Sequence, residues 1–160
     1  MRQTPSLLDV NVLIALLDVD HASHREAIRW FGAHAEAGWA SCPLTQNGCI
    51  RIMSSPAYPG FRPLTEVAER LRVWTQHKSH RFWANDISLL DEGLVETNRL
   101  HGPRQLTDAY LVALAVRNDG RLVTFDGSVS LSAVKGAKPS EVTITTSHGS
   151  DFHLDEDLHC

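Results

Sequence analysis

Cysteine is scarce in this sequence. The chain has three cysteines, Cys42, Cys49 and Cys160, which is an odd number without any C-x-x-C spacing. Secreted domains that depend on disulfides carry an even set at regular spacings. We therefore expect reduced thiols, as in a cytoplasmic protein, rather than a disulfide framework.

Long hydrophobic runs are also missing. The most apolar stretch, residues 6–17, is interrupted by Asp9 and Asn11, and Asp18 follows it. A membrane-spanning helix needs about 20 apolar residues, and a secretory signal needs an unbroken apolar centre. The sequence therefore predicts neither a membrane span nor a signal peptide.

An excess of basic charge is absent as well. Lys and Arg number 15 against 19 Asp and Glu, which gives a net charge of −4 at pH 7. Four of the acids lie in residues 151–160, which hold no Lys or Arg, so the first 150 residues carry 15 groups of each sign. No broad basic surface is predicted, and any contact with nucleic acid has to be local.

The remaining composition is that of one soluble domain. At 160 residues, with 42% apolar and 21% charged residues, the chain can bury about two-thirds of its unfolded surface. We expect the domain over residues 1–147 and an acidic, frayed tail over residues 148–160. The tail histidines, His148, His153 and His159, match no zinc-finger spacing.

Apolar periodicity predicts strands and helices in alternation. Helices are expected to start at Asn11, Ser23, Thr45 and Thr107, and to cover residues 65–77 and 89–100. Strands are expected at residues 7–8, 39–42, 81–84, 122–125 and 141–145. This order favours an α/β fold, a three-layer α/β/α sandwich around a mostly parallel central sheet.

Three carboxylates occupy comparable places in this pattern. Asp9 and Asp126 each follow a buried strand, and Asp108 lies in the first turn of the helix that leads into the Asp126 strand. If these two strands are neighbours in the sheet, all three acids meet at one crevice, where ligands of open parallel sheets bind. The alternative for Asp9 is that it only caps the following helix.

Crowded acids imply a metal ion. Like charges that close repel one another, so without a metal at least one of the three carboxyls should have a raised pKa. Ligands that are all oxygen favour Mg²⁺ or Mn²⁺ over zinc. Such an ion activates water for displacement at phosphorus.

The sequence around these acids resembles a known family. The segments LLDVNVLIALLD, LTDAYLVALAV and RLVTFD are similar to those of the PIN-domain nucleases, specifically the VapC-type toxins of bacterial toxin–antitoxin pairs. CPLTQNG, with RI following, resembles one branch of that group, and the resemblance spans residues 6–144. It implies a metal-dependent endoribonuclease that acts on RNA, is held inactive by a small antitoxin protein and is commonly a homodimer.

The resemblance also assigns roles to residues. It implies that Asp9, Asp108 and Asp126 are the catalytic metal ligands, with Asn11 and Thr107 as supporting residues. Members of the family usually carry a further acid on the helix that is expected to start at Thr45.

This chain departs from the family at that place. It has the neutral Gln46 and Asn47 there, which favours a single ion over a pair. If that helix faces the crevice, a glutamate in place of Gln46 should tighten metal binding. Asp91 and Glu92 could substitute for the missing acid, but their place at an expected helix start favours capping.

Local basic residues are needed to hold RNA on a neutral domain. Arg51 is the first candidate for a phosphate contact, followed by Arg104 and Arg25. Solvated surface arginines are the alternative for each.

Two other functions fit parts of the pattern. The missing fourth acid is compatible with a PIN-like module that binds RNA or a partner without cleaving. A receiver-like phosphoacceptor domain would need a lysine near the acids, and Lys135 is the only one of the three lysines that could serve.

Overall fold

A four-stranded parallel sheet forms the centre of the molecule in a computed structural model that describes residues 3–139. Its strands are β1 (Ser6–Leu8), β2 (Trp39–Ser41), β3 (His80–Phe82) and β4 (Arg121–Val123), in the order β3-β2-β1-β4. Strand β1 pairs with both β2 and β4. The strands that precede Asp9 and Asp126 are therefore neighbours, as the convergence of the acids requires.

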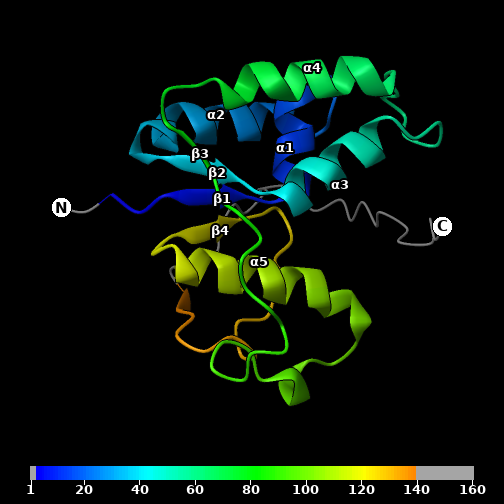
Figure 1. Cartoon of the computed structure of the whole chain (residues 1–160). Coiled ribbons are helices and arrows are strands. Elements are labelled where there is room, and N and C mark those ends of the chain that lie inside the picture. Colours follow the sequence, from blue (N-terminus) through cyan, green and yellow to red (C-terminus); the bar gives the residue numbers. More distant parts are fainter. Residues whose placement is uncertain (1–2, 140–160) are drawn as a thin grey trace.

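Helices cover both faces of this sheet (Figure 1). Helices α1 (Val10–Leu17), α2 (His24–His34), α3 (Pro43–Met53) and α4 (Leu64–Thr75) lie on one face. Helix α5 (Leu106–Arg117) lies on the other. Short 3₁₀ turns occur at Ala35–Ala37, Thr97–Arg99 and Pro103–Gln105. The predicted three-layer α/β/α sandwich is confirmed.

The hydrophobic core is divided by the sheet into two parts. Successive strand residues point to opposite faces, so Leu8 and Val123 pack with α1 to α4, whereas Leu7 and Leu122 pack with α5. All four side chains are fully buried. Because both faces are covered, the central strand β1 is buried at all three residues, which is typical of parallel sheets.

A glycine lets α3 approach the start of α1 closely. A Cβ atom at Gly48 would lie 2.7 Å from Cγ2 of Val10, the first residue of α1. Only a residue without a side chain fits this contact without a shift of Val10. Since Val10 follows Asp9 directly, the contact also places α3 beside the end of β1.

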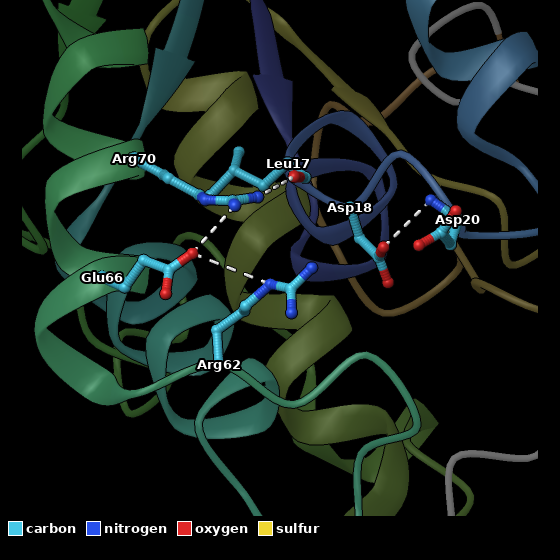
Figure 2. A network of polar contacts seen from close by, with 6 residues as sticks. All are labelled: Leu17, Asp18, Asp20, Arg62, Glu66 and Arg70. Atoms are coloured by element: carbon cyan, nitrogen blue, oxygen red, sulfur yellow. Dashed lines mark hydrogen bonds and ion pairs between the residues drawn. The ribbon is translucent and has the colours of Figure 1, made fainter.

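Polar contacts attach α4 to the end of α1. Figure 2 shows Arg70 on α4 donating to the carbonyl oxygen of Leu17, at a distance of 3.3 Å. The same guanidinium lies 2.8 Å from Glu66, which also has Arg62 at 3.7 Å. The three charged side chains are partly exposed, so their main effect is to orient α4 rather than to supply much stability.

The expected helix over residues 89–100 is wrong. The structure has turns there and the 3₁₀ turn Thr97–Arg99, while Val95 is buried and forms an antiparallel bridge with Val134. Asp91 accepts a hydrogen bond from the amide of Gly93, and Leu90 is 87% exposed. A leucine that stays in water offers a helix no buried stripe, and the Asp91 side chain caps a turn instead.

Several helices begin at other residues than expected. Helix α1 starts at Val10 with Asp9 as its cap, not at Asn11. Cys42 and Gln105, not Thr45 and Thr107, precede α3 and α5. Ser23 does precede α2, but its side chain makes no capping hydrogen bond.

Two expectations concern parts of the chain outside residues 3–139. The strand over residues 141–145 and the acidic tail over residues 148–160 lie there. Within the described residues, no helix has both the length and the apolar character that a membrane span requires.

Candidate functional site

Asp9 lies at the carboxyl end of β1 and is almost buried. Its backbone is extended, and its Oδ1 accepts a hydrogen bond from the amide of Val10 at 2.7 Å, so it caps α1. The alternative role that the sequence left open for Asp9 is therefore real. It does not exclude a second role, because the carboxylate has another oxygen.

That second oxygen faces β4. Oδ2 of Asp9 accepts a hydrogen bond of 2.7 Å from the hydroxyl of Thr124, which is itself 1% exposed. Asn11 completes the connection: its Nδ2 donates to Thr124 Oγ1 at 3.1 Å, and its Oδ1 accepts from the amide of Phe125 at 3.2 Å. Asn11 thus joins the start of α1 to the end of β4 and supports Asp9 through Thr124.

Asp126 completes this group from the same strand end. Its amide donates to Thr124 Oγ1 at 3.1 Å, and its side chain is exposed. Oδ1 accepts from both the amide and the hydroxyl of Ser128, at 2.8 and 2.6 Å. Ser128 therefore orients the Asp126 carboxylate from the loop that follows.

The pKa of Asp9 is raised from its ordinary value, as crowding of the acids predicts. Burial is the largest cause, the negative charge of Asp126 adds to it, and the hydrogen bonds from Thr124 and Val10 oppose it. Repulsion between carboxylates is therefore a minor contribution, and removal of water from Asp9 is the major one.

Asp108 lies in the first turn of α5 and is half-buried. Helix α5 packs under the sheet through Leu111 and Leu114, and three residues separate its end from β4. It therefore runs antiparallel to the strands, which puts its first turn at the carboxyl edge, where Asp9 and Asp126 lie. Thr107 lies in the same turn and is exposed.

The donor set suits a hard cation in chemistry, since Asp9, Asp126 and Asp108 offer only oxygen ligands. Of the three, Asp9 and Asp126 are linked directly, because both form hydrogen bonds with the hydroxyl of Thr124. Across residues 3–139, no three Asp, Glu, His or Cys side chains are grouped so as to hold a metal ion. A metal bound by all three acids would thus require the carboxylates to come closer together than they lie here.

Known proteins with similar sequences show the family of this chain. A profile of the PIN domain matches residues 6–135. Ribonuclease VapC44 of Mycobacterium tuberculosis is 50% identical over 132 residues, which cover 82% of this chain and 93% of that protein. The chain belongs to the PIN-domain family, among the VapC-type ribonucleases. Ribonuclease VapC39 of the same organism is 39% identical, with 82% and 95% covered.

Solved structures share the fold of this VapC-type domain. Mycobacterium tuberculosis VapC20, described as a toxin that cleaves the sarcin–ricin loop, superposes with a TM-score of 0.56 at 14% identity, covering 77% of this chain and 91% of that one. VapBC2 from Rickettsia felis, bound to a promoter DNA fragment, gives 0.52 at 11% identity, with 77% and 88% covered. With membership of this family shown, the receiver-like alternative is set aside.

The two neutral residues at the place where the resemblance implies a further acid lie in α3. Nε2 of Gln46 donates to the hydroxyl of Ser41, the last residue of β2, at 2.9 Å. Asn47 is exposed. Gln46 is thus already engaged with the sheet.

The three candidate arginines lie on separate elements, and all are exposed. Arg25 is in the first turn of α2, Arg51 is in the last turn of α3, and Arg104 is in the 3₁₀ turn just before α5. Arg104 precedes Asp108 by four residues and is therefore nearest to it in the chain.

Sequence reasoning missed Thr124 and Ser128. Thr124 is the polar residue within the apolar run LVTF, and a buried hydroxyl in such a run needs a partner. That signal could have identified it, given the condition that β4 lies next to β1. Ser128 gave no comparable signal, because serine near a strand end is common in turns.

Proposed function

We propose that this VapC-type domain cleaves RNA as an endoribonuclease with one Mg²⁺ or Mn²⁺ ion held by Asp9, Asp108 and Asp126. The observation that carries the proposal is the coupling of Asp9 and Asp126 through the hydroxyl of Thr124. It puts two carboxylates at the ends of the adjacent strands β1 and β4, where a helix cap alone would need only one. The ribonuclease names of the relatives support the same chemistry.

The side chains around the acids have defined tasks in this proposal. The bound ion would supply an activated water and offset negative charge at the phosphate. Thr124 and the amide of Val10 direct the lone pairs of Asp9, and Ser128 directs those of Asp126. Asn11 keeps the two strand ends in register through the Phe125 amide. These contacts hold Asp9 and orient Asp126, and Asp108 would complete the ligand set when an ion binds.

RNA would approach the same edge of the sheet. Arg104 is the candidate nearest in sequence to Asp108, and we assign it the first phosphate contact, ahead of Arg51 and Arg25. Few phosphate contacts imply modest affinity that falls gently with salt.

A small antitoxin is the proposed partner, and exposed apolar surface supports a place for it. A groove between α1, α2 and α4 contains three exposed side chains: Val19 at 67%, Val73 at 58% and Ile28 at 41%. Trp74 lines it as well, whereas Trp39 and Trp83 belong to the core. An apolar segment of the antitoxin would cover this surface, which solvent otherwise wets.

A homodimer is part of the same proposal and rests on the family. Sedimentation of the isolated chain at micromolar concentration, without antitoxin, tests it directly. A monomer under those conditions would count against the dimer and would leave the proposed chemistry in place.

The nuclease proposal is tested with RNA, metal and two matched variants. Cleavage should require Mg²⁺ or Mn²⁺, should stop with EDTA, and should be lost in Asp126→Asn. Asp119→Asn is the control, because Asp119 is an exposed acid in the turn between α5 and β4, at the opposite end of β4 from Asp126. Its φ is +52°, a value that asparagine also adopts. Cleavage that persists in excess EDTA would refute the metal mechanism, and a metal-replete chain without any cleavage would favour the inactive RNA- or partner-binding module.

A further inference from the structure

Ser41 lies at the centre of a buried chain of hydrogen bonds outside the acid group. It is the last residue of β2 and is fully buried. Its hydroxyl oxygen lies 2.8 Å from Nε2 of His80, the first residue of β3, and 2.9 Å from Nε2 of Gln46 in α3. One hydroxyl therefore joins a helix to the edge strand of the sheet.

The direction of these hydrogen bonds follows from the number of hydrogens. The backbone carbonyl of Thr75, the last residue of α4, interacts with the His80 ring as an acceptor, so we place the ring proton on Nδ1, the nitrogen that does not face Ser41. A neutral imidazole has only one N–H, so its Nε2 must accept from the Ser41 hydroxyl. Ser41 has then spent its only hydrogen, so the amide of Gln46 must be the donor to Ser41.

The surroundings of His80 favour the neutral ring that this chain needs. Burial lowers the pKa of His80, the positive charges of Arg81 and His77 lower it further, and the Thr75 carbonyl opposes them. The uncharged ring of Trp39 packs against the imidazole, with centroids 4.5 Å apart. A donor at position 46 and a neutral His80 are therefore mutually consistent.

We propose that Ser41 and His80 are positioning residues that hold Gln46 as a hydrogen-bond donor, so that position 46 ties the first half of α3 to the sheet instead of standing open for a fourth acid. The proposal rests on the proposed function only in locating the site at this edge. Strand β2 lies beside β1, and α3 packs through Gly48 on Val10, next to Asp9. The hydrogen bond from Gln46 to Ser41 thus fixes α3 beside the site, and Gln46 does not contact the ion.

A carboxylate at position 46 would reverse the direction of the hydrogen bonds that run from Gln46 through Ser41 to His80. Glutamate can accept from Ser41 but cannot donate, so the Ser41 hydroxyl would turn to it and leave Nε2 of His80 without a donor. A second proton on His80 restores the bond, now donated from the ring to Ser41. Gln46→Glu should therefore raise the pKa of His80, and should not add a ligand to the metal.

The first test is a nitrogen-15 NMR titration of the His80 ring. The wild type should show a neutral ring with its proton on Nδ1 at pH 7. Gln46→Glu should shift the pKa of His80 upward, and the double variant Ser41→Ala/Gln46→Glu should lose more than half of that shift. Gln46→Met, which has similar length and no charge, should give no upward shift.

Either of two results would overturn the proposal. One is no upward shift in Gln46→Glu. The other is a shift of which half or more persists without the Ser41 hydroxyl, since that would be simple attraction between charges. If a variant does not fold, the position of the ring proton in the wild type still decides. A proton on Nε2 of His80 would contradict the proposal, because that nitrogen could then not accept from the Ser41 hydroxyl.

The second test is calorimetry with Mn²⁺ on the wild type and on Gln46→Glu. A change in affinity below about fivefold is expected, and a gain of about fivefold or more would make position 46 a metal ligand and overturn the proposal. If neither protein binds Mn²⁺, the proposed nuclease mechanism fails, while the NMR titration still decides whether Gln46 is tied to Ser41.

Discussion

The hydroxyl of Thr124 donates to Oδ2 of Asp9 across 115 positions of sequence, at 2.7 Å. This hydrogen bond links the residues that directly follow β1 and β4. It also lets one buried carboxylate serve two structural purposes, because Oδ1 caps α1 while Oδ2 holds the neighbouring strand end.

Thr124→Val should uncouple the site. Valine has the same shape but no hydroxyl, so Asp9 loses one donor while Asn11 and the Asp126 amide lose an acceptor. We expect a loss of about 1–3 kcal/mol in the free energy of unfolding, a further rise in the pKa of Asp9, and little cleavage. Thr124→Ser keeps the hydroxyl and should retain most of both properties. Urea unfolding in EDTA beside RNA cleavage in Mn²⁺ measures them, and equal behaviour of the two variants would contradict the role of the hydroxyl.

Gly48→Ala should disturb the site from a distance. The added methyl group would lie 2.7 Å from Val10 Cγ2, so α3 or the start of α1 must shift. Alanine favours helices by about 1 kcal/mol over glycine, and we expect the clash to offset this gain and reduce Mn²⁺ affinity. Gly32→Ala is the control, because nothing lies within 4 Å of a Cβ there, and it should stabilise α2. Higher Mn²⁺ affinity in Gly48→Ala would show that the contact is not needed.

Stability should fall as the pH is lowered below neutrality. Burial lowers the pKa of both His21 and His80, so between their native pKa values and about 6.5 the unfolded chain binds more protons than the native protein. The free energy of unfolding therefore rises with pH through this window. Above it, the two histidines make no further contribution to the pH dependence. His80→Asn should remove part of the slope. The raised pKa of Asp9 acts in the opposite direction but equally in both proteins, so the difference between the wild type and His80→Asn isolates the histidine. Urea titrations at pH 5.5 and 7.5 measure the change of stability with pH. The same change in both proteins would contradict the role of His80.

A charge in the apolar groove should block the antitoxin and spare the chemistry. Val73 is 58% exposed, so Val73→Asp should fold normally, cleave RNA at the wild-type rate and bind antitoxin more weakly, because a carboxylate would be buried at the contact. Leu90→Asp is the matched control, since Leu90 is 87% exposed and outside the groove. Equal antitoxin affinity for both variants would place the partner elsewhere.

The sequence predicted the layer order because strands and helices alternate along it. That β1 and β4 are neighbours was only a condition for the acids to meet, and the structure fulfils it. It did not predict how Asp9 divides its two oxygens, since that depends on a strand 115 positions away. The helix expected around Leu90 failed for a related reason. Its leucine spacing is helical, but Val95 pairs with Val134, and periodicity within one segment carries no information about such a partner.

The position of Gln46 illustrates the same limit. Its residue type showed that an acid was missing, but only the contacts of the buried Ser41 with Gln46 and His80 indicate what the amide does there. Whether an amide acts as a weak ligand or as a donor to the sheet depends on neighbours from β2, β3 and α4.

The distance in sequence between Asp9 and Asp126 has a consequence during protein synthesis. The first 120 residues can form β1 to β3 and their helices, but neither Thr124 nor Asp126 is then available to the end of β1. Because domains are completed as their last elements leave the ribosome, the carboxylate pair cannot exist on a growing chain until β4 has emerged. The carboxylate pair of the candidate site is thus among the last features of this domain to form.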